Sequence, residues 1–211
     1  MTKIHNLAEK ATWEELSKEE IAYVEKKFKE AIPGEDLDLC TYIYILGRIG
    51  AITHRPAIEK YLECPLDSFA AEQALKVLCI YWRYTEDYLE KVMAFIKGVE
   101  WDVNDDVRLM ALSVAGEHLR RTDHKEPLNQ ELLKLLSCFF FDPRSIPGYQ
   151  RDYDYKRDLL RSCAYQALAR AVGKDHNEIL DGDSIEDLIT HNRLDELDPT
   201  VLEKIRFFSR L

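Results

Sequence analysis

The sequence predicts an all-α protein built as an α-solenoid of about five antiparallel helix pairs. Four segments are apolar runs with the period of a helix, at residues 38–49, 70–82, 107–119 and 160–172. Three of them pair a central alanine with a second small residue five positions later, at Ala74 and Cys79, Ala111 and Gly116, and Ala164 and Ala169. Only 8 Gly and 7 Pro occur in 211 residues, which leaves little sequence for long loops.

The first helices are predicted from their caps. Residues 12–15 and 17–20 both fit the capping box, in which a hydroxyl and a carboxylate bind the free N–H groups of a helix start. The second box begins a helix with Val24 and Phe28 on one face, and Pro33 and Gly34 end it. A helix over residues 37–49 follows, and Gly50 ends that one.

The central helices follow the same logic. Pro56 suits the first position of a short helix. Asp67 or Ser68 is expected to cap a helix that runs to about residue 82. Apolar spacing then predicts helices over 86–96 and 107–119, the latter capped by Asn104 or Asp105.

The last helices are predicted over residues 129–141, 156–172, 184–191 and 199–208. Asp198 and Pro199 supply the cap and the first residue of the final one. Residues 142–155 form the single long connection and contain two prolines, a glycine and three tyrosines.

Two of the periodic segments resemble the second helix of a HEAT repeat. Residues 105–116 place an acidic pair before Val107 and Arg108 and end in Ala115 and Gly116, and residues 158–169 are similar. The resemblance implies a right-handed solenoid that forms one domain over residues 1–211. Residues 1–35 would be N-terminal cap helices, 36–173 the repeats with the inserted loop 142–155, and 174–211 a C-terminal capping helix pair.

The same resemblance implies that the second helix of each pair lines a concave surface. It also implies that Arg108 and Arg161 lie near acidic turns of neighbouring repeats, where they form a structural ladder of charge-assisted hydrogen bonds.

The charge of the chain bears on its partners. A net charge of −10 disfavours binding to nucleic acid and favours a basic protein partner. Five Cys without a Cys-x-x-Cys motif, four of them within apolar helical runs, indicate a reducing compartment. The first ten residues lack the apolar stretch of a signal peptide, and no apolar run reaches the ~18 residues of a membrane span. We therefore expect a cytoplasmic protein that does not bind membranes.

Motifs for catalysis or for cofactors are missing from the sequence. The six His and five Cys show no zinc-ligand spacing. Residues 102–106 begin like a calcium loop, but Val107 and Ser113 occupy the positions that require Gly and Glu. Phosphate-binding glycine loops and a nucleophile elbow do not occur. We expect a protein that is not an enzyme and that holds neither metal nor cofactor.

Two groups of residues are candidates for partner binding. Tyr and Arg dominate binding hot spots, and long loops on rigid scaffolds often carry function. The loop 142–155 and its border contribute Tyr149, Arg151, Tyr153 and Tyr155. Acidic residues that could steer a basic partner are Asp102, Asp105, Asp106, Asp183, Glu186 and Asp187.

The leading functional hypothesis is a non-enzymatic protein-binding module with an acidic concave surface. Small acidic binders of this kind resemble immunity proteins, antitoxins that neutralise basic toxin nucleases by covering their substrate surface. The alternatives are a HEAT-like DNA glycosylase, a ligand-binding solenoid such as a HEAT-like bilin lyase, and a general scaffold or assembly chaperone.

Overall fold

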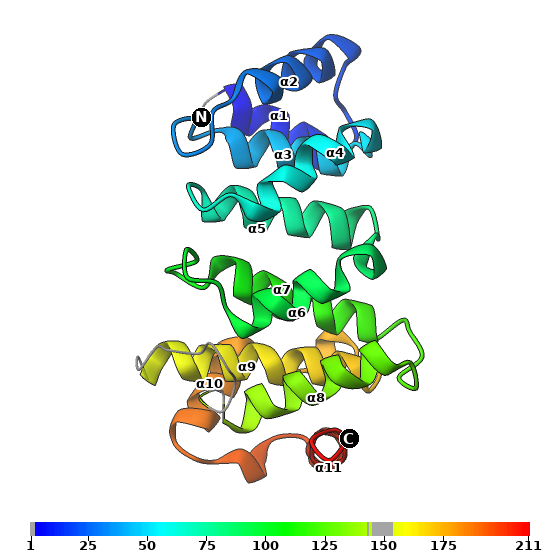
Figure 1. Ribbon diagram of the computed structural model, residues 1–211, viewed down its shortest axis with the longest axis vertical. Coiled ribbons are helices and arrows are strands. Elements are labelled where there is room, and N and C mark those ends of the chain that lie inside the picture. Colours follow the sequence, from blue (N-terminus) through cyan, green and yellow to red (C-terminus); the bar gives the residue numbers. More distant parts are fainter. Residues whose placement is uncertain (1–2, 143, 145–153) are drawn as a thin grey trace. The chain divides into compact units, whose positions relative to one another are not determined.

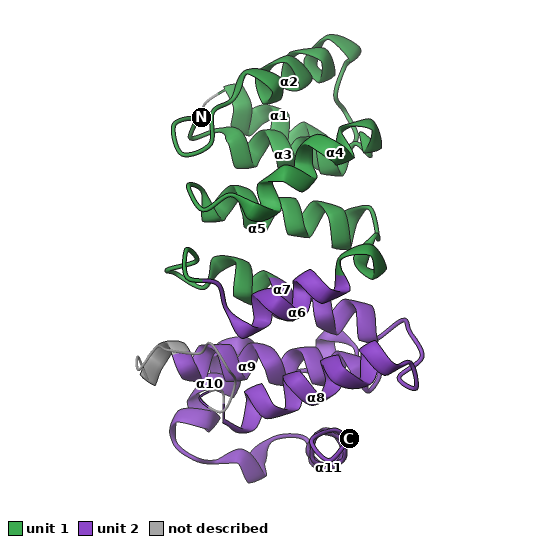
Figure 2. Cartoon of the chain, viewed as in Figure 1, with its two compact units in different colours: residues 1–88, 100–110 green, residues 89–99, 111–211 purple. Residues whose placement is uncertain are grey.

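The computed structural model describes residues 3–142, 144 and 154–211, except for the side chains of 154–156. These residues form eleven α-helices and no strand, which confirms the all-α prediction (Figure 1). In this part of the chain, no helix is long and apolar enough to cross a membrane. The chain divides into two compact units, residues 1–88 with 100–110 and residues 89–99 with 111–211 (Figure 2). The finer prediction, a single right-handed solenoid of HEAT-like pairs, stays a prediction.

Unit 1 contains five α-helices with short helical segments between them. The α-helices are α1 (Lys3–Thr12), α2 (Lys18–Glu30), α3 (Leu39–Arg48), α4 (Arg55–Ile58) and α5 (Ser68–Lys76). The short segments are η1 (Ile52–His54), η2 (Glu59–Glu63), η3 (Val77–Tyr81) and η4 (Thr85–Tyr88), of which η3 is a π-helix that continues α5. Helix α7 (Asp106–Leu119) begins in unit 1.

Local chemistry explains where these helices start. The capping box predicted at Ser17 is present, since its hydroxyl accepts from the Glu20 N–H and the Glu20 carboxylate accepts from the Ser17 N–H. The carboxylate of Asp67 accepts from the Ala70 N–H and caps α5. The box predicted at Thr12 was wrong because Thr12 ends α1, where its hydroxyl donates to the Ala8 carbonyl.

The core of unit 1 surrounds α3, which contacts α1, α2 and α5. Ile43, Ile45 and Leu46 of α3 are fully buried. Gly47 is a point of close approach, since a Cβ atom built there would lie 2.4 Å from Cγ2 of Val77. A side chain at position 47 would therefore push α3 away from η3.

Unit 2 contains α6 (Leu89–Lys97), α8 (Pro127–Phe141), α9 (Asp154–Ala171), α10 (Gly182–Thr190) and α11 (Pro199–Phe208). The short segments η6 (His176–Glu178) and η7 (Leu194–Glu196) lie beside α10 in sequence. As predicted, Asp198 caps α11, because its carboxylate accepts from the N–H groups of Thr200 and Val201.

Phe139 and Phe140 are the largest fully buried side chains of unit 2, and α8 packs against α9. Gly116, the small residue five positions after Ala111, marks a close approach to α9: an added Cβ atom would lie 2.7 Å from the Cα of Ala167. Gly47 and Gly116 are therefore both points of contact between helices.

Candidate functional site

The candidate binding residues of the long loop belong to a part of the chain that the structure does not describe. Tyr149, Arg151 and Tyr153 lie outside the described residues, and so does the side chain of Tyr155, whose backbone belongs to α9. Their role in binding stays a prediction.

Two of the predicted acidic residues form the buried turn before α7. Asp102 is 2% exposed and Asp105 is 4% exposed. The Asp102 carboxylate accepts from the backbone N–H of Arg108 at 3.0 Å, and the Arg108 guanidinium donates to Asp105 at 2.9 Å. Burial raises the pKa of Asp102, although the N–H donors of Arg108 and Val107 oppose this shift. Contrary to the prediction, these two side chains shape a turn and present almost no surface to a partner.

Asp106 is less buried and connects two turns of unit 1. Its carboxylate accepts a hydrogen bond of 3.1 Å from the hydroxyl of Ser68, at the start of α5. One turn further along α5, burial raises the pKa of Glu72, and the nearby Asp106 carboxylate adds to the effect. Negative charge is therefore concentrated where α5 and α7 begin.

The acidic residues predicted in the C-terminal part lie on α10. Asp183 and Asp187 are exposed, and Asp187 pairs with His191 in the next turn. Glu186 is half-buried, and its pKa is raised by burial and then by the carboxylates of Asp158 and Asp183. Asp183 is therefore an exposed carboxylate near the start of this helix, and its role in partner binding stays a prediction.

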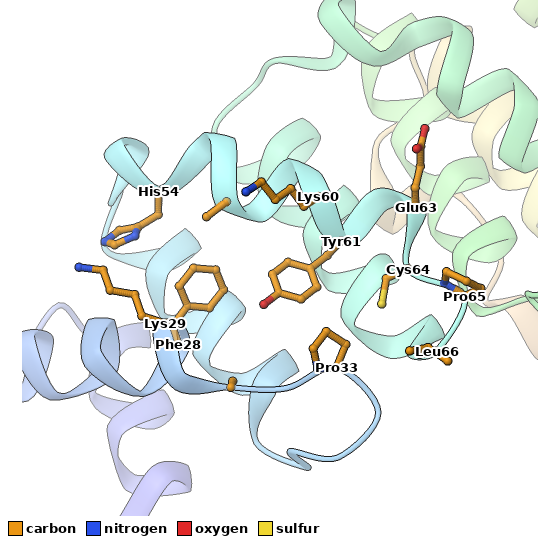
Figure 3. A pocket seen from close by; sticks show the side chains of 12 residues that line it. Phe28, Lys29, Pro33, His54, Lys60, Tyr61, Glu63, Cys64, Pro65 and Leu66 are labelled. Carbon is orange, nitrogen blue, oxygen red and sulfur yellow. The ribbon is translucent and has the colours of Figure 1, made fainter.

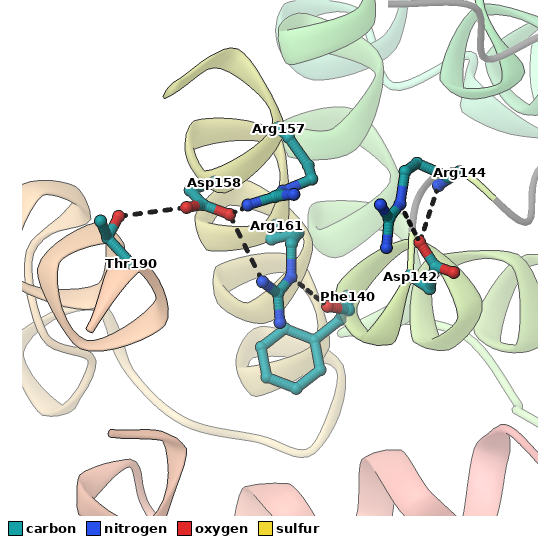
Figure 4. Close-up of polar contacts among 7 residues, drawn as sticks. All are labelled: Phe140, Asp142, Arg144, Arg157, Asp158, Arg161 and Thr190. Carbon is teal, nitrogen blue, oxygen red and sulfur yellow. Dashed lines mark hydrogen bonds and ion pairs between the residues drawn. The ribbon is translucent and has the colours of Figure 1, made fainter. Parts of the chain in front are cut away.

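A second polar cluster joins α9 to its neighbours in unit 2 (Figure 4). The buried Asp158 carboxylate accepts from Arg157 at 3.1 Å, from Arg161 at 3.3 Å and from Thr190 of α10 at 3.2 Å. Arg161 also donates to the carbonyl oxygen of Phe140 in α8 at 2.7 Å. This cluster holds three helices together, so we assign it to stability.

Arg108 and Arg161 behave alike in a way that the HEAT resemblance did not imply. Each pairs with the aspartate three residues before it: Asp105 immediately precedes α7, and Asp158 lies one turn inside α9. Both pairs are charge-assisted hydrogen bonds between near neighbours in sequence, and Arg161 and Asp158 bond in addition to α8 and α10.

The strongest candidate for a binding surface is formed by three turns of unit 1. We call residues 32–38, 63–69 and 100–107 the turn edge. They contain three, two and four Asp or Glu residues respectively, of which Asp102 and Asp105 are buried, and no Lys or Arg. Figure 1 shows these turns on the same side of unit 1, at the left, where α3, α5 and α7 begin.

Contacts hold the three turns side by side. A Cβ atom on Gly34 would lie 3.2 Å from the carbonyl oxygen of Leu66, so the first turn touches the second. The hydrogen bond between Ser68 and Asp106 joins the second turn to the third. The turn edge is therefore a continuous surface.

Apolar side chains on this edge are unusually exposed. Leu37 is 94% exposed, Leu66 is 76% exposed and Phe69 is 56% exposed. The three residues line a recess of about 320 Å³ together with Asp36 and Asp67. Large apolar groups that gather beside like charges are typical of surfaces that another molecule covers.

Backbone hydrogen bonds fix the acidic residues of this recess. The Asp36 carboxylate accepts from the Asp38 N–H at 3.0 Å, and the Asp67 carboxylate accepts from the Ala70 N–H at 2.9 Å. Among the described residues, no group of three or more His, Cys, Asp or Glu side chains is arranged to hold a metal ion. The turn edge is suited to recognition by charge and by apolar contact.

Leu37, Leu66 and Phe69 were not predicted as functional residues. The absence of Lys and Arg from these three turns was a signal available in the sequence. The exposure of the apolar residues could not be read from the sequence, because it depends on how the three turns pack against one another.

Comparison with known proteins adds no family to this description. No protein-family model matches the chain, and neither the curated proteins nor the solved structures gave a significant match.

Proposed function

We propose that the protein is a non-enzymatic binding module that holds a basic protein partner at the turn edge. The observation that carries the proposal is the grouping of Leu37, Leu66 and Phe69 with Asp36 and Asp67 on adjoining turns. In this proposal the chain acts as an immunity-type protein and covers the basic surface of a toxin nuclease.

The physical argument combines two effects. Complementary charge speeds the encounter with a cationic surface and excludes acidic competitors. Exposed apolar side chains supply contact area that charge alone does not give, and they need apolar counterparts on the partner. The proposed partner segment therefore combines Lys or Arg with Leu, Ile or aromatic residues.

A peptide titration followed by amide NMR tests the surface. The probe is a short peptide that alternates Lys and Leu, and the comparison peptide replaces each Leu by Ser. The Lys/Leu peptide should shift signals of residues 32–38, 63–69 and 100–107 and bind more weakly as salt rises. Stronger effects elsewhere, or equal binding of the Lys/Ser peptide, would contradict the proposal.

Matched variants separate the turn edge from the rest of the surface. Replacing Leu37, Leu66 and Phe69 by Ser should weaken binding at least tenfold. The same change at Ile52 and Leu128, which are exposed elsewhere, should leave it unchanged. Glu35→Lys on the edge should likewise weaken binding more than Glu131→Lys. Glu131 is the matched control because both glutamates are exposed and only Glu35 lies on the turn edge.

The inhibitory role needs a test of its own. If a neighbouring gene encodes a basic nuclease, co-expression of the wild-type chain should restore growth, and the triple Ser variant should fail to do so. Restored growth with the triple variant would show that the turn edge is not the contact surface.

A further inference from the structure

Unit 1 contains a larger recess on the side formed by α2 and residues 54–66. Its volume is about 550 Å³, which lies in the range of small-molecule sites. Phe28, Pro33, Ala57 and Tyr61 form its apolar lining (Figure 3). It shares Pro33, Glu63, Cys64, Pro65 and Leu66 with the turn edge, and the rest of its lining comes from residues 28–31 and 54–61.

Aromatic rings define the inner surface of this recess. The ring centroids of Phe28 and Tyr61 lie 5.8 Å apart with their planes inclined by 53°. The His54 ring meets Phe28 edge to face at the same centroid distance. Contacts between rings keep these side chains in place, so the apolar surface exists before a ligand arrives.

The charges around the recess are the reverse of those on the turn edge. Lys29 and Lys60 line it, both are exposed, and the structure shows no ion pair for either amine within the described residues. Figure 3 shows both lysines extending toward the end at which His54 lies. In a chain with a net charge of −10, two unpaired lysines beside an apolar recess are a local reversal of charge.

Two carboxylates are nearby, and the structure accounts for both. The Glu25 carboxylate lies 3.0 Å from His54 Nε2, within the distance of a hydrogen bond or an ion pair. The Glu63 side chain points away from the rings that line the recess (Figure 3). The two lysine amines therefore remain available to an anion.

We propose that this recess binds a small organic acid. The apolar body of the ligand, aromatic or branched aliphatic, lies against Phe28 and Tyr61, and its carboxylate pairs with Lys29 and Lys60. Apolar burial supplies the affinity, and the two ammonium groups select an anion over a neutral molecule of the same shape. This site is independent of the partner proposed for the turn edge, since its test involves no protein partner.

The experiment is an amide NMR titration with 3-phenylpropionate and with its neutral amide, 3-phenylpropionamide. Saturable shifts should be confined to residues 28–33 and 54–66, and the acid should bind at least fivefold more tightly than the amide. Equal affinity for acid and amide, or shifts outside those residues, would overturn the proposal.

Variants identify the groups involved. Lys29→Gln combined with Lys60→Gln should weaken binding of the acid at least tenfold and leave the weak binding of the amide unchanged. Lys134→Gln with Lys204→Gln is the matched control, because these lysines are exposed and lie outside the recess. If the two pairs of substitutions had equal effects, the proposed ion pairs would be excluded.

Ala57→Phe tests the cavity itself by filling it. It should abolish binding of both probes while leaving the thermal unfolding curve cooperative. A folded Ala57→Phe protein that binds the acid with unchanged affinity overturns the proposal. If that variant does not fold, the comparison of acid with amide and the lysine variants decide.

Discussion

The indole Nε1 of Trp82 donates a hydrogen bond of 3.1 Å to the backbone carbonyl oxygen of Gly47. This bond joins the residue after η3 to the helix α3, at the point where the absent side chain of Gly47 lets the two segments meet. The contact depends on both features, an indole long enough to reach the helix and a residue without a Cβ atom.

Gly47→Ala should destabilise unit 1. The new methyl group would lie 2.4 Å from Cγ2 of Val77 and 2.9 Å from Cδ2 of Tyr81, which is closer than van der Waals contact allows. Overpacking of this kind costs about 1–3 kcal/mol. Urea unfolding followed by circular dichroism measures the loss. Gly182→Ala is the control, because the nearest atom to an added Cβ there is 3.7 Å away. Equal stability of the two variants would contradict the packing described for α3 and η3.

Asp158→Ala should destabilise the protein by about 2–4 kcal/mol, because it leaves Arg157 and Arg161 without their shared carboxylate. Asp183→Ala, at an exposed position of α10, should change stability by less than about 0.5 kcal/mol. Chemical denaturation compares the two. A small effect of Asp158→Ala would mean that the cluster in Figure 4 does not hold the helices.

Asp198→Asn should lower stability at neutral pH, and this effect should shrink as the pH falls below about 4. Lys174, at 2.8 Å, and then Thr200 hold the pKa of Asp198 well below the ordinary value of 3.8. A lowered carboxyl pKa contributes stability above the unfolded-state pKa and loses it as the pH falls toward the folded-state pKa. We expect a difference of about 1 kcal/mol at pH 7, reduced because both side chains are partly exposed.

Thermal melts from pH 7 to pH 3 test this expectation. The melting temperatures of wild type and Asp198→Asn should converge as the pH falls below about 4. Asp195→Asn, at an exposed neighbouring position, should follow the wild type throughout. A constant difference between wild type and Asp198→Asn would show that the effect is not due to charge.

Cys79 and Cys163 should resist alkylation in the folded protein. Burial raises the pKa of Cys79 to about 12 and that of Cys163 to about 11, so few thiolates form at pH 8. Mass spectrometry after iodoacetamide treatment should find Cys64, on the wall of the larger recess, modified first. In urea, reaction at buried Cys79 and half-buried Cys163 should accelerate by at least about a hundredfold. Equal rates in native and denatured protein would contradict their burial.

Helices that are capped by a side chain close in sequence could be predicted from the sequence. Ser17 and Asp198 act within three residues of themselves, so their caps were predicted correctly. The cap of α7 was assigned to Asn104 or Asp105, but the carboxylate that accepts from the Arg108 N–H is that of Asp102, six residues earlier. A cap of this kind depends on the path of the turn, which the periodicity of apolar residues does not describe.

The candidate surface was harder to predict for a related reason. Periodicity assigns apolar residues to a buried or an exposed face only within a helix, and Leu37 and Leu66 lie in turns. Their grouping depends on the contact between the turn of Gly34 and the turn of Leu66, and these two residues are 32 positions apart in sequence. The acidic composition of those turns was visible, but the apolar cluster within them was not.

The absence of Lys and Arg from the turn edge also bears on how the protein behaves when concentrated. Two identical copies cannot neutralise each other there, because each presents only carboxylates around Leu37, Leu66 and Phe69. Repulsion between the carboxylates of two copies opposes self-association through these apolar groups at neutral pH. Near pH 4, where carboxylates take up protons, this repulsion is lost. The protein should then aggregate, which light scattering would detect.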